Sequence, residues 1–305
     1  MAERLSTAER QQLISKWISP STEAEADRQA RAERMVKDAI AAHGAFDDVR
    51  SNLTIVAKGS YPNNTNVRSD SDVDIKVQLN SLYYYDFAPG VVAFPNRSSS
   101  SYTGRWTPTL LRQEVGRALV KAFGSGVDDS HNVAFYVPPV PGSRPNVDVV
   151  PCFEYRLFTN GAGTSFHTGS VVYCRDSGRI VNWPELQLAH GRTKNTNTGK
   201  RYKFVVRVLK SVENELCWQK RIEAVPSYFS ECLIYNVPDH VLKNGSFDDA
   251  VRLSLGEVYA QLGSRSEAMM EPNEIKKLFG PQQKWTVETA RELVEQAWVY
   301  LGYGR

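Results

Sequence analysis

The stretch Gly59–Leu79 reads GSYPNNTNVRSDSDVDIKVQL and carries the most informative pattern in the chain. From Asp72 onward, polar residues alternate strictly with valine, isoleucine and leucine, which is the period of a half-buried β-strand. Asp72 and Asp74 therefore lie on one face of that strand, within reach of a common cation. Mg²⁺ takes one or two protein carboxylates and completes its shell with water and phosphate, so the pair indicates a nucleoside triphosphate site.

Two further features extend the pattern. Gly59 and Ser60 follow a short strand predicted at 53–58; a glycine lets the backbone approach a phosphate, and a serine hydroxyl can donate to its oxygens. Asp148, in the later strand NVDVV, is a third acidic residue on a strand. A lone D-x-D is equally consistent with the wet face of a surface strand. The complete set instead resembles the signature of the polymerase β superfamily, and that resemblance implies two metal ions that clamp the attacking and leaving oxygens of a displacement at phosphorus.

A row of basic residues lies on a helix predicted at 201–221. Lys203, Arg207 and Lys210 recur at i, i+4 and i+7 and so share one face. Like charges at this spacing repel each other unless an anion lies across them, and a triphosphate tail is such an anion. The alternative interpretation is a solvated helix face.

Ser227 and Tyr228 open the next predicted helix, directly after Pro226. A hydroxyl and the free N–H groups of a helix start can bind phosphate, and an aromatic ring gives a base a surface to stack on. A tyrosine buried in the core is the alternative for Tyr228.

Composition limits the class of protein. The 305 residues suggest one large or two closely packed lobes, and 37 basic against 34 acidic residues are too balanced for a long nucleic-acid partner. The cysteines have no paired spacing and no histidine cluster, so we expect neither disulfides nor zinc. No apolar run is long enough for a membrane span and the first residues lack a secretion signal, so we expect a cytoplasmic protein without a membrane partner.

Periodicity and turn residues predict the order of elements. The helix and strand patterns place helices at 22–43 and 107–119 and strands at 53–58, 72–79, 131–137 and 145–150. After Gly191 the pattern becomes helical, with helices at 201–221, 227–236, 247–262 and 286–301. A first part with a sheet is thus followed by an all-helical part.

Five motifs resemble one known family: GSYPNNTNVRSDSDVDIKVQL, NVDVVP, IVNWPELQLAHGRTKN, YKFVVRVLK and VPSYFSECLIYNVPD. They resemble the bacterial cGAS/DncV-like nucleotidyltransferases (CD-NTases) of the polymerase β-like superfamily, and clade E, the CdnE-like enzymes, in particular. The resemblance covers roughly residues 25 to 300. It implies an α+β, bilobal fold with a mixed sheet and helices in residues 1–175, including the long N-terminal helix. Residues 176–305 are then a C-terminal helical lobe, and the active site lies in the cleft.

The resemblance also implies an activity. Members are cyclic dinucleotide synthases of anti-phage (CBASS) signalling, which join nucleoside triphosphates and release pyrophosphate. For this chain it implies a 3′,5′-linked product that contains uridine, cyclic UMP-AMP or cyclic di-UMP, made from UTP and ATP or from UTP alone. Two Mg²⁺ ions, for which Mn²⁺ can substitute, would be the cofactors. The expected protein is a bacterial cytoplasmic monomer whose product is sensed by an effector protein.

Carried over by position, the resemblance assigns roles to individual residues. The catalytic metal ligands are Asp72, Asp74 and Asp148, the phosphate-binding residues are Gly59, Ser60, Lys210 and Ser227 with Lys203 and Arg207 as further candidates, and Tyr228 stacks on the donor base. Asn182 occupies the acceptor-base position, where a carboxamide offers a donor and an acceptor to uracil. From the residues alone, an asparagine before Trp183-Pro184 is also a common turn residue.

Two other interpretations stay open at this stage. One is nucleotidyl transfer to an RNA 3′ end or to the hydroxyl of a small molecule, although the balanced charge disfavours an extended RNA track. The other is a catalytically silent nucleotide-binding module, which the presence of all three aspartates disfavours. Lys58, before Gly59, departs from the neutral polar residue that is familiar in the family.

Overall fold

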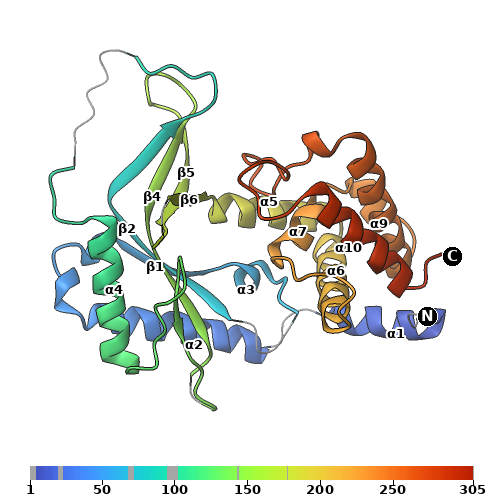
Figure 1. Cartoon of the computed structure of the whole chain (residues 1–305), viewed down its shortest axis with the longest axis horizontal. Coiled ribbons are helices and arrows are strands. Elements are labelled where there is room, and N and C mark those ends of the chain that lie inside the picture. Colours follow the sequence, from blue (N-terminus) through green and yellow to red (C-terminus); the bar gives the residue numbers. More distant parts are fainter. Residues whose placement is uncertain are drawn as a thin grey trace. The chain divides into compact units, whose positions relative to one another are not determined.

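The structure is a computed structural model that describes residues 5–19, 23–67, 72–94, 102–142, 144–176 and 178–304. The chain forms two compact units (Figure 1). The sheet unit consists of Glu23–Tyr61 and Asp70–Glu185, and the helical unit consists of Met1–Thr22, Pro62–Ser69 and Leu186–Arg305. The units therefore do not follow the predicted division into 1–175 and 176–305: the chain crosses between them several times.

One mixed sheet organises the sheet unit, as predicted from the sequence. Its order is β1-β2-β4-β5-β6, with β3 also paired to β4, and only β2 and β4 run parallel among the described pairs. The strands are β1 (Leu53–Lys58), β2 (Val73–Phe87), β3 (Phe135–Val137), β4 (Val147–Phe158), β5 (Phe166–Tyr173) and β6 (Arg179–Asn182). The last two were not predicted from the sequence, because His167, Thr168 and Gly169 interrupt the apolar pattern of β5.

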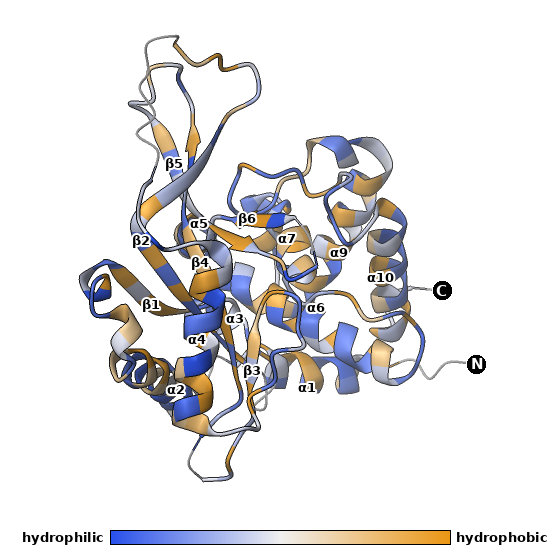
Figure 2. Cartoon of the chain, turned by 60° about the vertical axis from the view of Figure 1, so that its left-hand side comes forward, coloured by the Kyte–Doolittle hydropathy of each residue, from blue (hydrophilic) through white to orange (hydrophobic). Residues whose placement is uncertain are grey.

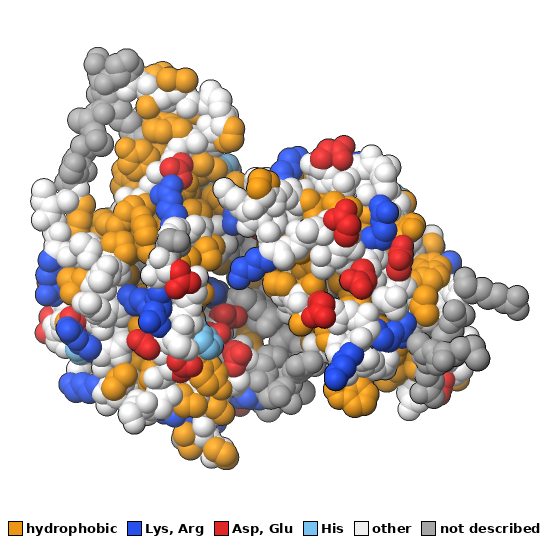
Figure 3. All heavy atoms as spheres, viewed as in Figure 1, with side chains coloured by type: hydrophobic (Ala, Val, Ile, Leu, Met, Phe, Trp, Pro, Cys, Tyr) orange, Lys and Arg blue, Asp and Glu red, His pale blue; other side chains and the backbone are white. Residues whose placement is uncertain are grey.

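Strand β2 is longer than the predicted 72–79. Its pairing with β4 shifts register between Leu79 and Tyr83 and then continues to Phe87. This irregularity interrupts the alternation of polar and apolar residues, so the sequence pattern predicted only the first part of the strand. The distal part carries exposed aromatic side chains, including Tyr83 and Tyr85. Figure 3 shows the apolar side chains gathered on this side of the sheet unit.

The polar face of β2 is buried at Lys76 and Gln78, whereas the sequence predicted a strand with one exposed face. Lys76 and Gln78 are both almost fully buried. The ammonium of Lys76 donates to Gln78 Oε1 at 3.0 Å and forms an ion pair with Glu185. The buried lysine is tolerated because its charge and its hydrogen bonds are satisfied within the unit.

Helices α2 (Glu23–Ala41) and α4 (Pro108–Phe123) pack against each other and against the sheet (Figure 1). Both were predicted, at 22–43 and 107–119. In both, apolar and polar segments alternate around the helix, as Figure 2 shows, so one side can be buried. Thr107 caps the start of α4, where its hydroxyl accepts from Leu110 N at 3.2 Å.

The helical unit is built around α6 (Arg201–Trp218), most of whose residues are buried. The other main helices are α1 (Thr7–Trp17), α5 (Pro184–Asn197), α7 (Tyr228–Tyr235), α9 (Phe247–Ser264) and α10 (Val287–Tyr300). Its shorter segments are α8 (Asp239–Leu242) and η3 (Ser266–Ala268), whereas η1 (Gly44–Phe46) and η2 (Arg50–Asn52) belong to the sheet unit and α3 (Ser60–Asn63) begins in the sheet unit and ends in the helical unit. The predictions for α6, α7, α9 and α10 are confirmed, whereas α1 and α5 were not predicted.

Helix α1 belongs to the helical unit, although the sequence prediction assigned all of residues 1–175 to the first lobe. Arg10 is buried and donates to Asp248 Oδ1 at 3.0 Å and to the carbonyl of Leu301 at 2.9 Å. These contacts join residues more than two hundred positions apart, which local patterns cannot reveal. None of the helices in the described part of the chain combines the length and apolar character that a membrane crossing requires.

Candidate active site

Asp74 and Asp148 lie side by side on the parallel strands β2 and β4, as direct register partners. Asp72 immediately precedes β2 and is exposed, and Asp74 is half-buried. The intervening Val73 and the following Ile75 are fully buried, so they fix which way the aspartates face. The fold therefore brings the three predicted aspartates to one end of two neighbouring strands.

Asp148 is the aspartate of this set whose negative charge lies in an unfavourable environment. Its Oδ1 is buried and has no hydrogen-bond partner. Burial, followed by the negative charges of Asp72 and Asp74, raises the pKa of Asp148 to about 6. An orphaned carboxylate oxygen beside two further carboxylates suits a hard divalent cation, which binds oxygen and offsets most of their negative charge.

The other two aspartates have protein partners. Asp74 Oδ1 lies 3.6 Å from the ammonium of Lys58, and Asp72 accepts a hydrogen bond from the amide of Asn146. In the described part of the chain, no group of three or more Asp, Glu, His or Cys side chains is already arranged as a metal-binding set. The backbone thus brings the three aspartates to the same strand end, and their binding of metal ions stays a prediction.

Gly59 is constrained by Asp74. Its φ is +76°, and a Cβ at this position would lie 2.5 Å from Asp74 Oδ2. Any side chain here would strain the backbone and displace the carboxylate. The next residue, Ser60, is half-buried and begins α3. The sequence indicated a close approach at Gly59, and the structure identifies Asp74 as one group that approaches it.

The basic residues of α6 do not form an open face, so the alternative of a solvated helix face does not hold, while phosphate binding stays a prediction. Lys203, Arg207 and Lys210 are all buried. Arg207 donates to the backbone carbonyls of Asn64, at 2.8 Å, and Ile18, and burial lowers its pKa to about 10. Its guanidinium thus joins three segments of the helical unit, a structural role that the helix pattern could not reveal.

Lys210 faces a buried polar cluster within the helical unit. Its ammonium lies 3.3 Å from Thr65 Oγ1 and 4.0 Å from Glu231 Oε2. Glu231 is 1% exposed and also accepts from Asn63 at 2.5 Å and from Gln187 at 3.2 Å. The sequence analysis did not identify Glu231, although an acidic residue within an apolar helix such as α7 was an available signal.

Ser227 and Tyr228 begin α7 as expected. Ser227 is exposed, and its side chain makes no capping hydrogen bond. Tyr228 is partly buried: its hydroxyl donates to Glu271 Oε2 at 3.2 Å, and its ring packs edge-on against Trp285. The core interpretation therefore holds for part of the Tyr228 side chain, while Ser227 is accessible.

Asn182 ends β6 and is exposed. Its register partner on β5 is Ser170, and the neighbouring Trp183 is buried with its ring edge against Tyr155. The buried indole anchors the chain directly after Asn182. The position is therefore an accessible side chain on a fixed backbone, which suits a role in recognition.

The predicted site residues fall into two sets. The sheet unit carries Asp72, Asp74, Asp148, Gly59, Ser60 and Asn182, and the helical unit carries Lys203, Arg207, Lys210, Ser227 and Tyr228. Within the first set, the aspartates and Gly59 lie together. A cleft that unites the two sets stays a prediction.

Comparisons with known proteins agree with this architecture. Residues 189–302 match the family model of the cGAS/DncV-like nucleotidyltransferase C-terminal helical domain. The chain is 34% identical over 295 residues to the cyclic dipyrimidine nucleotide synthase CdnE of Legionella pneumophila, covering 95% of this chain and 97% of the relative. It is 30% identical over 258 residues to a cyclic dipurine nucleotide synthase of Elizabethkingia meningoseptica, covering 82% of this chain and 86% of the relative.

A comparison with solved structures also finds a CdnE synthase. The CdnE c-UMP-AMP synthase of Rhodothermus marinus, determined with Apcpp and Upnpp, superposes with a TM-score of 0.80 and 26% identity, covering 96% of this chain and 97% of that one. Fold, sequence and the family model therefore agree. The chain is a nucleotidyltransferase that belongs to the CdnE-like branch of the cGAS/DncV-like enzymes.

Proposed function

We propose that this enzyme joins UTP with ATP, or two molecules of UTP, into a 3′,5′-linked cyclic dinucleotide and releases pyrophosphate. The observation that carries the catalytic part is the direct register pairing of Asp74 with Asp148, next to Asp72. Burial of Asp148 beside Asp72 and Asp74 raises its pKa, so a cation bound among the three carboxylates would relieve their repulsion.

Asp72, Asp74 and Asp148 would hold two Mg²⁺ ions, or Mn²⁺ in their place. Bound there, the ions would stabilise the negative charge on the attacking and leaving oxygens of phosphoryl transfer. In each of the two transfers a 3′-hydroxyl oxygen bonds to an α-phosphorus, the hydroxyl loses its proton, and the bond to the β-phosphate breaks. Gly59 keeps the space beside Asp74 clear of a side chain.

The residues of the helical unit would bind the triphosphate of the donor. Ser227 offers an accessible hydroxyl at the start of α7, and Lys210 supplies a positive charge. The Tyr228 ring would support the donor base, held in place by its contact with Trp285 and by the hydrogen bond from its hydroxyl to Glu271.

Asn182 supports the choice of uridine. The relatives differ in product, since one is named a dipyrimidine and another a dipurine synthase, so family membership alone leaves the base open. A carboxamide can donate and accept at the edge of uracil, and Asn182 is exposed on a backbone anchored by Trp183.

The product would act as a signal in anti-phage (CBASS) defence, read by a separate effector protein. This part of the proposal rests on the family resemblance. The substrates themselves, UTP and ATP, agree with the nucleotide analogues in the Rhodothermus marinus structure.

A product assay tests the proposal. The purified chain is incubated with Mg²⁺ and all four ribonucleoside triphosphates, with one α-³²P-labelled at a time, and products that resist phosphatase are separated. We expect a resistant product labelled from UTP, and none from the variant Asp72→Asn/Asp74→Asn. Linear products alone would contradict the cyclisation, and a resistant product labelled only from purine nucleotides would contradict the uridine assignment.

A further inference from the structure

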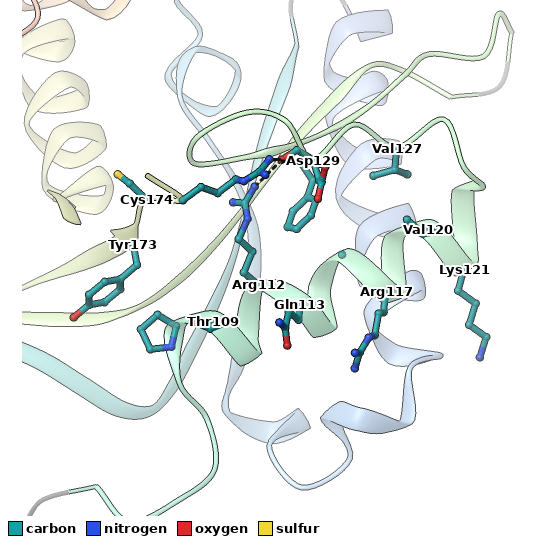
Figure 4. Close-up of a pocket in the computed structure, with 14 residues that line it drawn as sticks. Thr109, Arg112, Gln113, Arg117, Val120, Lys121, Val127, Asp129, Tyr173 and Cys174 are labelled. Atoms are coloured by element: carbon teal, nitrogen blue, oxygen red, sulfur yellow. Dashed lines mark hydrogen bonds and ion pairs between the residues drawn. The ribbon is translucent and has the colours of Figure 1, made fainter. Parts of the chain in front are cut away.

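A pocket of about 830 Å³ opens on the sheet unit, and none of the predicted site residues lines it. Its floor is α4, and its walls come from residues 127–135 and the end of β5 (Figure 4). Phe135 lines it and is the register partner of Val149 on β4, whereas Asp148 pairs with Tyr136. Because side chains alternate along a strand, Phe135 and Asp148 lie on opposite faces of the sheet. The pocket is therefore separate from the aspartate site.

One face of α4 contributes most of the lining. Thr109, Arg112, Gly116 and Val120 follow one another at helical spacing and all line the pocket, while the opposite side of the helix is buried. At Gly116 an added Cβ would lie 2.9 Å from the Phe135 ring, so the ring packs directly on the helix backbone. The pocket thus has a rigid floor.

Positive charge dominates the pocket. Among the described residues that line it, four are basic and one is acidic: Arg112, Arg117, Lys121 and Arg175 against Asp129. The whole chain has 37 basic and 34 acidic residues, so this local excess does not follow from composition. Such an excess in a concave surface attracts anions.

Among these basic residues, Arg112 has a guanidinium held in place by several contacts. Its guanidinium stacks over Phe135 at 4.5 Å, and its Nη2 donates to the carbonyl of His131 at 3.0 Å and to those of Asp129 and Ala134 at 3.3 Å. Figure 4 shows the side chain reaching from α4 toward Asp129. Carbonyl groups orient the guanidinium without neutralising it. Burial, and then the like charge of Arg175, lower the pKa of Arg112, as expected where cations gather.

The remaining cations are more accessible. Arg175 bonds to the carbonyl of Asp129 and lies 3.9 Å from its carboxylate, and Lys121 is exposed at the far end of α4. Arg117 is paired with Glu114, outside the pocket lining, at 2.5 Å. A fixed guanidinium flanked by more exposed basic side chains matches an anion with several phosphate groups better than a single carboxylate.

We propose that this pocket is a second anion site that binds a compact, phosphate-rich ligand of nucleotide size. The volume accommodates a nucleoside triphosphate, and the aromatic side chains of Phe135 and Tyr173 in its lining are suited to contact with a base or sugar. Inorganic triphosphate and a nucleotide share the chemistry that the cations recognise. The proposal is independent of the reaction at the aspartates.

The test uses the full chain in metal-free buffer with EDTA, so that metal-dependent binding at the aspartates is removed. Inorganic triphosphate and ATP are added separately, affinity is measured by calorimetry, and the binding site is located by hydrogen exchange. We expect protection of peptides from α4 and residues 127–135. Equal affinities would identify the phosphates as the recognised group, and tighter binding of ATP would identify the nucleotide.

Two double variants remove the same charge at different places. Lys121→Gln/Arg175→Gln changes the pocket, and Lys37→Gln/Arg50→Gln changes other exposed positions of the sheet unit. We expect the first to weaken triphosphate binding at least about tenfold and the second to leave it unchanged. The proposal is overturned if both variants bind like the wild type, or if protection maps only to the region of Gly59 and the aspartates. Neither result would affect the proposed synthesis of a cyclic dinucleotide.

Discussion

Lys58 and Asp74 are register partners on the antiparallel strands β1 and β2, and their charged groups lie 3.6 Å apart. The sequence marked Lys58 only as a departure from the family, whereas the structure makes it the ionic partner of a proposed metal ligand. A cation that must be displaced before a metal ion binds reduces the apparent affinity for that ion.

The substitution Lys58→Met removes this competitor. If Asp74 binds Mg²⁺, we expect half-maximal activity at about threefold lower Mg²⁺, a factor in keeping with a partly exposed ion pair. A Mg²⁺ titration of product formation measures it. Lys37→Met, which removes an exposed lysine paired with Glu33, is the control and leaves the titration unchanged. An unchanged or higher Mg²⁺ requirement in Lys58→Met would speak against the competition.

Gly59→Ala tests the contact with Asp74. A left-handed backbone costs an alanine about 1 kcal/mol, and here the new methyl group also collides with Asp74 Oδ2. We expect a nearly complete loss of product formation with a limited loss of stability, measured by urea unfolding. Gly90→Ala is the matched control, since Gly90 has a φ of +81° and an added Cβ there would have nothing within 4 Å. Equal activity of the two variants would show that the Asp74 contact is unimportant.

Asp148→Asn separates stability from catalysis. The substitution removes a buried negative charge that Asp72 and Asp74 repel, so we expect the metal-free protein to melt about 2 °C higher or more, while activity disappears. Differential scanning fluorimetry with EDTA provides the measurement. The exposed Asp176→Asn serves for comparison and should change neither property. A lower melting temperature for Asp148→Asn would mean that the carboxylate stabilises the fold.

Arg207 and Lys210, one turn apart on α6, should respond differently to replacement by methionine. Arg207→Met leaves the carbonyls of Asn64 and Ile18 without their donor, and we expect a loss of about 3 kcal/mol in unfolding free energy. For Lys210→Met we expect chiefly a rise in KM for the nucleoside triphosphate. Urea unfolding and steady-state kinetics distinguish the two. The assignment of Lys210 to phosphate binding fails if its variant unfolds early but retains the wild-type KM.

Asn182→Ser should change the product and leave the fold intact. A serine hydroxyl cannot reproduce the carboxamide pattern, so we expect purine incorporation to rise at the expense of uridine. Competition between labelled UTP and ATP in one reaction measures the ratio. Asn52→Ser, at another exposed asparagine of the sheet unit, controls for the substitution itself. A ratio identical to that of the wild type would remove Asn182 from base selection.

Local patterns in the sequence were sufficient to predict several helices and strands. The alternation around Asp72 and Asp74 placed both on one face of β2, since burial of Val73 and Ile75 leaves a strand no other orientation. The ends of α4 are also determined locally, by the side-chain cap of Thr107 and by Gly124, whose φ is +87°. Such signals involve residues a few positions apart and therefore do not depend on the rest of the fold.

Only the tertiary structure decided which distant residues meet. The sequence could state that Asp148 is on a strand, but its position beside Asp74 follows from the parallel pairing of β2 with β4. The basic residues of α6 do share the predicted spacing, but Arg207 is buried and donates to the backbone carbonyls of Asn64 and Ile18. The basic pocket on α4 likewise needs Arg175 from a different segment. In each case the deciding contact joins residues far apart in the chain, and sequence periodicity carries no information about such pairs.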